Sequence, residues 1–148
     1  MRFRAIPAVA VLLGLLCASS CGRQAGRAIA KQFRRAETVT IIDSKTARQI
    51  ATVRLSQDLR AMADGLALGE AGAEEQGGPT FILVLEFPDG SEGKAYVEVD
   101  YRADPSGEIR RGCVQYQGIG QVHPRALFWD VFDKYVLPAL PASRRPRT

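Results

Sequence analysis

The chain has little of what catalytic and metal sites are usually built from. Its 148 residues include one histidine, His123, so a zinc site with two or more histidine ligands is excluded, as is a Cys₂His₂ site. No serine lies in a Gly-x-Ser-x-Gly segment, and Gly118-Ile119-Gly120 lacks the third glycine of a dinucleotide-binding fingerprint. We therefore expect no catalytic residues, no metal ligands and no cofactor, and we interpret the protein as a non-enzyme.

The chain also lacks an apolar run long enough to span a bilayer, for which a helix needs about 20 residues. Its N-terminal apolar stretch, Ala8 to Leu16, is shorter than that and follows two arginines, Arg2 and Arg4. Small residues come next: Ala18, Ser19 and Ser20. A positive start, a short apolar stretch and small residues before a cut are the three parts of a secretory signal. Residues 1–20 are predicted to be a signal peptide.

The residues Ala18-Ser19-Ser20-Cys21 resemble the lipobox of a bacterial lipoprotein precursor, although that family usually has Leu where this chain has Ala18. The resemblance covers residues 1–22 only. It implies that the cut precedes Cys21 and that Cys21 becomes the lipid-bearing first residue, carrying palmitate-type acyl chains. In this family an Asp after the cysteine retains the protein in the inner membrane. Gly22 therefore implies the outer membrane, facing the periplasm, rather than the inner membrane.

Ordinary secretory cleavage at the same bond is the alternative, because Ala18 and Ser20 also satisfy the small-x-small rule. Cys21 would then be a thiol at the mature N-terminus, where a disulfide with Cys113 competes with lipidation. If Cys21 is acylated, Cys113 is the last cysteine of the mature chain. We then expect it to be buried and inert.

The charges of the chain are segregated. Residues 21–35 hold five basic residues and no acid, and the end from Arg144 adds three arginines, whereas residues 36–143 hold 10 Lys and Arg against all 16 Asp and Glu. We predict a basic flexible tether over residues 21–36 and a basic disordered tail over residues 138–148. The tether either lies against anionic head groups or is merely soluble. Nucleic-acid binding is disfavoured, because the predicted body is acidic.

Residues 37–137 are predicted to form a single α+β domain in the order ββαβββα, an antiparallel sheet of about five strands with two helices packed on one face. Leu59, Met62 and Leu66 form an apolar stripe with helical period, and His123-Pro124 is interpreted as the start of the last helix. The predicted strands are 38–42, 48–54, 80–87, 94–102 and 109–117, and the predicted helices are 56–69 and 123–137, with a loop over 69–79.

The predicted function is that of a membrane-anchored, non-catalytic envelope lipoprotein that binds another envelope protein, as an inhibitor or immunity protein does. The alternative is a secreted periplasmic enzyme that acts through carboxylates or through a Cys113/His123 nucleophile–base pair. Two carboxylates of one strand, Glu98 and Asp100, are expected to point to opposite faces and so not to act together. The Cys113/His123 pair is disfavoured, because the two residues are placed in a strand and at a helix start.

Overall fold

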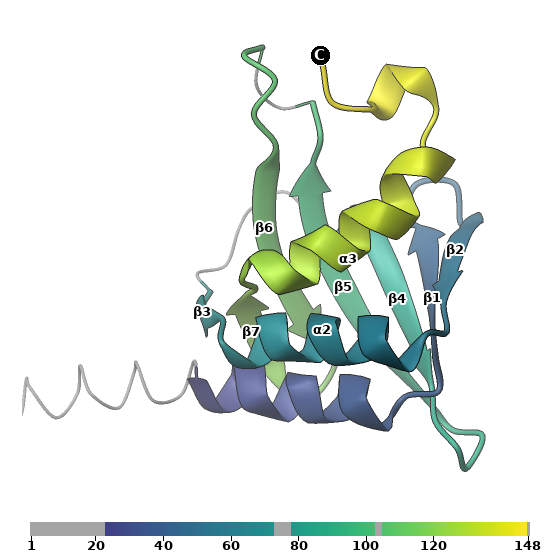
Figure 1. Ribbon diagram of the computed structural model, residues 1–148, viewed down its shortest axis with the longest axis vertical. Helices are drawn as coiled ribbons and strands as arrows, with labels where there is room; N and C mark the ends of the chain where they lie inside the picture. The colour runs from purple at the N-terminus through teal and green to yellow at the C-terminus, as the bar shows by residue number, and fades with distance from the viewer. Residues whose placement is uncertain (1–22, 73–77, 103–104, 148) are drawn as a thin grey trace, which may run out of the picture.

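The computed structural model describes residues 23–72, 78–102 and 105–147, and Figure 1 shows their arrangement. The predicted signal peptide and Cys21 lie outside these residues. A helix over residues 23–35, called here the N-terminal helix, precedes the labelled elements. In chain order these are β1 (Thr38–Asp43), β2 (Gln49–Val53), α2 (Ser56–Ala67), β3 (Glu70–Ala71), β4 (Phe81–Glu86), β5 (Glu92–Asp100), β6 (Arg110–Tyr116), β7 (Gly120–His123), α3 (Ala126–Val136), η1 (Leu137–Ala139) and η2 (Ala142–Arg144).

The strands form one antiparallel sheet in the order β2-β1-β4-β5-β6-β7-β3. The predicted α+β class and antiparallel sheet are confirmed, but the described residues hold seven strands rather than about five. The two missed strands, β7 and β3, have four and two residues, which is too short to show an alternating pattern. His123 ends β7 opposite Glu70, and α3 begins at Ala126, so the predicted helix start at His123-Pro124 is wrong.

Three helices, rather than the two predicted, cover one face of the sheet among the described residues (Figure 1). The N-terminal helix lies beside α2, where Arg34 forms an ion pair with Asp64 at 2.9 Å, and it reaches α3 through the rings of Phe33 and Phe128. The prediction of a flexible tether is therefore wrong for residues 23–35. Ile29 and Phe33, four residues apart, give this basic helix an apolar face, and both are fully buried.

The core lies between the sheet and the helix layer. Alternate residues of the strands point inward, as the period of two requires. On the central strands these are Phe81, Leu83 and Leu85 of β4 and Ala95, Val97 and Val99 of β5. From the helix layer, α3 contributes Phe128 and Phe132 to the core. The Phe132 ring meets the Phe81 ring edge-on at a centroid distance of 5.5 Å. The apolar stripe of α3 is therefore core.

Two glycines allow the helices to approach closely. A Cβ atom on Gly65 of α2 would lie 2.4 Å from the backbone nitrogen of Phe128 in α3. A Cβ atom on Gly26 of the N-terminal helix would lie 2.6 Å from the carbonyl oxygen of Leu66. Cβ contacts this short do not occur without backbone movement, so these glycines set the helix spacing.

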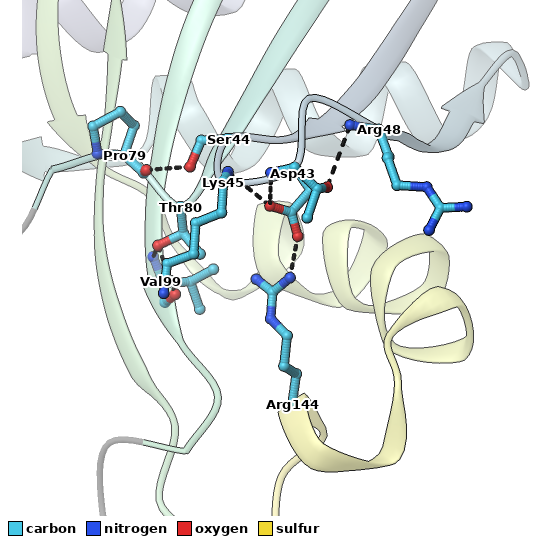
Figure 2. A network of polar contacts seen from close by, with 9 residues as sticks. Asp43, Ser44, Lys45, Arg48, Pro79, Thr80, Val99 and Arg144 are labelled. Atoms are coloured by element: carbon cyan, nitrogen blue, oxygen red, sulfur yellow. Dashed lines mark hydrogen bonds and ion pairs between the residues drawn. The ribbon is translucent and has the colours of Figure 1, made fainter.

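The C-terminal segment packs on the body, so the prediction of a disordered tail over residues 138–148 is wrong for residues 138–147. Leu140 is buried, and the Arg145 side chain donates a hydrogen bond to the Leu140 carbonyl oxygen at 2.9 Å. Arg144 forms an ion pair with Asp43 at the end of β1 (Figure 2). The buried apolar residues of the described ranges run from Ile29 to Leu140, so a chain beginning at Gly22 contains all of them.

Candidate functional site

The outward face of β1, β4 and β5 carries apolar side chains on the side of the sheet away from the helices. Ile42 pairs with Ile82, and Ile82 pairs with Tyr96, so these three side chains form one row across the strands. Val84 lies two residues from Ile82 on the same face. All four residues are half-buried, in contrast to the inward residues between them. We call Ile42, Ile82, Val84 and Tyr96 the open-face patch.

Polar side chains continue the row beyond Tyr96. Tyr96 pairs with Gln115, which pairs with Gln121 of β7. A shallow pocket of about 230 Å³ lies here. Its lining residues are Gly78, Pro79, Tyr96, Glu98, Cys113, Gln115 and Gln121. This surface offers amide groups and one carboxylate beside the apolar patch, which is the composition of a binding surface with a polar rim.

Cys113 and His123 lie on the neighbouring strands β6 and β7. A Cβ atom added to Gly72 would lie 3.5 Å from the Cys113 Cβ atom and 3.4 Å from the His123 Cδ2 atom, so both side chains flank Gly72. The expected helix start at His123, which disfavoured the pair, is therefore wrong: His123 is in a strand, close to Cys113.

The contacts of the two side chains are nevertheless structural. His123 Nδ1 lies 3.2 Å from the Gly112 carbonyl oxygen, and the Cys113 thiol donates to Gln121 Oε1 at 3.8 Å. Cys113 itself is buried. These contacts, with the hydrogen bond that Gln121 Nε2 donates to the Gly72 carbonyl oxygen at 3.0 Å, tie β6, β7 and the segment after β3 together.

Glu98 and Asp100 lie on the same face of β5, so the expectation that they point to opposite faces is wrong. Residues two apart in a strand project to the same side of the sheet. Both line a pocket of about 430 Å³ together with Arg102, Arg110 and Arg144. Asp100 Oδ1 accepts a hydrogen bond from the Arg102 backbone N–H at 2.9 Å, so this carboxylate holds a turn.

Asp43 is the centre of the polar network beside that pocket (Figure 2). It is 3% exposed, and its Oδ1 atom accepts hydrogen bonds from the backbone N–H groups of Lys45 and Thr46 at 2.8 and 3.2 Å. Arg144 contacts the other oxygen. Burial acts to raise the pKa of Asp43, but the hydrogen bonds from Arg144 and the backbone, with the Arg144 charge, outweigh it and lower the pKa. Both oxygens have a role in the fold.

Two hydroxyl groups near Asp43, those of Ser44 and Thr80, form hydrogen bonds between neighbouring segments (Figure 2). Ser44 donates to the Pro79 carbonyl oxygen at 2.6 Å, which fastens the β1–β2 turn to the start of β4. The Thr80 hydroxyl donates to the Val99 carbonyl oxygen at 2.9 Å and accepts from the Val99 N–H at 3.3 Å. These contacts replace missing ladder hydrogen bonds at the strand ends, so the corner is a structural unit.

A buried carboxylate also fixes α3. Asp58 of α2 accepts hydrogen bonds from the Tyr135 hydroxyl at 2.6 Å and from Lys134 Nζ at 2.9 Å. The Tyr135 hydrogen bond, and after it Lys134, lower the pKa of Asp58 against the opposing effect of burial. Burial first, and then the hydrogen bond to Asp58, raise the pKa of Tyr135 to about 12. The pair therefore joins α2 and α3 over a wide pH range.

Asp133 joins α3 to the sheet in the same way. It accepts a hydrogen bond from the Tyr101 hydroxyl at 2.7 Å and a two-pronged ion pair from Arg111, with distances of 3.2 and 2.7 Å. The Arg111 guanidinium also lies over the Trp129 ring, 5.2 Å from its centroid. Burial, followed by the nearby Asp133, raises the pKa of Tyr101. These ionisable groups are partnered across elements and stabilise the fold.

Comparison with protein-family models, with curated proteins and with solved structures finds no match to this chain. Within residues 23–72, 78–102 and 105–147, no group of three or more His, Cys, Asp and Glu side chains is placed to hold a metal ion. No helix in the same ranges has the length and apolar character needed to cross a membrane. The functional interpretation therefore depends on the surfaces of the domain and on the N-terminal sequence.

Proposed function

We propose that this protein is a lipid-anchored, non-catalytic envelope protein that binds another protein through the open face of its sheet. The observation that carries the binding role is the open-face patch. The helix layer covers the other face and buries the inward residues of β1, β4 and β5. The four patch residues are only half-buried and therefore contact solvent. Contiguous apolar surface with a polar rim is typical of protein interaction sites.

The anchoring part of the proposal rests on the signal-peptide pattern and the lipobox-like residues before Cys21. The N-terminal helix is already formed at Arg23, two positions after that cysteine. A lipid on Cys21 therefore holds the domain close to the bilayer, without a long spacer. A binding surface presented in this way acts on partners in or near the same membrane.

Charge indicates what such a partner looks like. Glu86 and Glu92 pair with each other at the end of the β4–β5 hairpin, beyond Val84, and both are exposed. Glu98 lies beyond Tyr96 on the same face. The patch thus has carboxylates at both ends, interrupted by Lys94. The complementary partner surface is apolar at its centre and basic at its edges.

The open face is tested by placing a photo-crosslinking residue in the full chain in its native bacterium. We expect positions 82 and 96 to give an adduct with the same partner. Position 57, which is exposed on α2, is the control and should give none. Val84→Glu should remove the adduct from both patch positions without changing the thermal unfolding midpoint, because Val84 is only half-buried.

Equal adducts from position 57 would show that crosslinking does not depend on the open face. Adducts that survive Val84→Glu would show that the partner does not contact the patch. Either result contradicts the proposed binding surface.

A further inference from the structure

The outer face of the N-terminal helix carries a stripe of positive charge. Among the residues of this helix, 23–35, five are basic and none is acidic. Arg23, Arg27 and Lys31 follow one another at intervals of four, and Arg34 and Arg35 follow them. Residues four apart in a helix share a face, and all five side chains are exposed. The basic side chains therefore form a continuous surface on one face of the helix and are not distributed around it.

The two ends of the stripe differ in their partners. At the C-terminal end, Arg34 pairs with Asp64, and Arg35 bonds Gln32 Oε1 and lies 5.1 Å from the centroid of the Phe87 ring. In the part of the chain that the structure describes, no acidic side chain forms an ion pair with Arg23, Arg27 or Lys31. The uncompensated charge is thus concentrated at the N-terminal end, next to Cys21.

The stripe is fixed relative to the body of the protein. The opposite side of the same helix buries Gly26, Ile29, Ala30 and Phe33 against α2, α3 and the sheet. A flexible tether would let the domain rotate freely under its anchor. A packed helix does not, so a surface that binds the stripe also orients the whole domain.

We propose that Arg23, Arg27 and Lys31 dock this helix on the anionic phospholipid headgroups of a membrane, so that the domain has a fixed orientation there. This inference deepens the proposed lipid anchoring. Two signals, an acyl chain and a basic patch, together give stable membrane association where one alone is weak. The helices cover one face of the sheet (Figure 1), and the open-face patch belongs to the opposite face, so it remains accessible in this orientation.

The test uses the chain from Gly22 to Thr148, which contains every buried apolar residue of the described ranges and has no lipid. Its partition onto phosphatidylcholine vesicles with and without about one third phosphatidylglycerol is measured by co-sedimentation. Each basic residue near an anionic surface contributes about a factor of five, so Arg23→Gln/Arg27→Gln/Lys31→Gln should weaken binding to the anionic vesicles about 100-fold. The charge-conserving variant Arg23→Lys/Arg27→Lys should bind like the original chain.

The matched control is Lys45→Gln/Arg48→Gln/Arg54→Gln, which removes the same charge from exposed residues of the β1–β2 hairpin and the residue after it. We expect it to bind almost as well as the original chain. Equal loss in both triple variants, or equal binding to vesicles without phosphatidylglycerol, would overturn the docking proposal. Tighter binding to duplex DNA than to the anionic vesicles would overturn it in favour of nucleic-acid binding.

Docking and anchoring can fail separately. If the protein is acylated but its domain does not prefer anionic vesicles, the result supports the lipid anchor and contradicts the docking surface. If the domain prefers anionic vesicles through these three residues but the protein is never acylated, the result supports the docking surface and contradicts the lipid anchor.

Discussion

Phe33→Ala should lower the free energy of unfolding by about 3–5 kcal/mol, the usual effect of removing a buried Phe side chain. Phe33 is fully buried, and its ring meets that of Phe128 edge-on at a centroid distance of 6.4 Å. Truncation therefore removes apolar contact and leaves a cavity between the N-terminal helix and α3. Urea denaturation followed by circular dichroism measures the change, and we expect the slope to be unchanged.

Lys31→Ala is the control for Phe33→Ala, because it changes an exposed residue two positions away in the same helix. Its free energy of unfolding should differ little from that of the original chain. If Phe33→Ala were equally neutral, residues 23–35 would not be part of the folded domain. The fixed orientation of the basic stripe would then lose its support.

Phe132→Ala is expected to have an effect of the same size, about 3–5 kcal/mol, because it empties the centre of the core. The Phe132 ring is fully buried, with ring-centroid distances of 5.5 Å to Phe81, 5.7 Å to Phe128 and 5.9 Å to Trp129. A domain has only about 5–15 kcal/mol of stability in total, so this variant should be near the limit of folding. The denaturation midpoint should fall sharply.

Asp130→Ala is the proper control for Phe132→Ala, because Asp130 is exposed on α3. Asp133, which lies next to Phe132, is not a neutral choice, since it accepts hydrogen bonds from Tyr101 and Arg111. A Phe132→Ala variant with the original midpoint but impaired partner binding would mean that the apolar face of α3 is exposed and functional. That result would contradict the packing of α3 on the sheet.

The elements that could be predicted from the sequence are those with strong local patterns. The stripe of Leu59, Met62 and Leu66 predicted α2 over 56–69, and the structure has it over Ser56–Ala67. The apolar run of β4 was predicted over 80–87 and is observed over Phe81–Glu86. In both cases the hydrophobic period is long enough to identify the element on its own.

The N-terminal helix was missed because its basic residues dominate its composition. The signal that could have found it is the spacing of Gly26, Ile29, Ala30 and Phe33, which puts small and apolar residues on one face. The contact between Arg144 and Asp43 has no such signal. The two residues are 101 positions apart, and only the assembled sheet and α3 bring them together.

The surroundings of Cys113 and His123 could not be predicted either, because they depend on the short strand β7 and on its pairing with β6. The four patch residues, in contrast, could have been placed on one face by alternation along β1, β4 and β5. Their half-buried state depends on which face the helices cover. Strand alternation alone does not determine that face.

A lipid anchor on Cys21 is tested most directly by the mass of the N-terminal peptide of the mature protein extracted from its native membrane. We predict that this peptide begins at Cys21 and carries acyl chains. We also predict that Cys21→Ala leaves uncleaved precursor that a palmitate analogue no longer labels, while Cys17→Ala, which changes a cysteine inside the signal, is processed and labelled normally. An unmodified Cys21 at the mature N-terminus, or normal release of Cys21→Ala as a soluble protein, would contradict lipid anchoring.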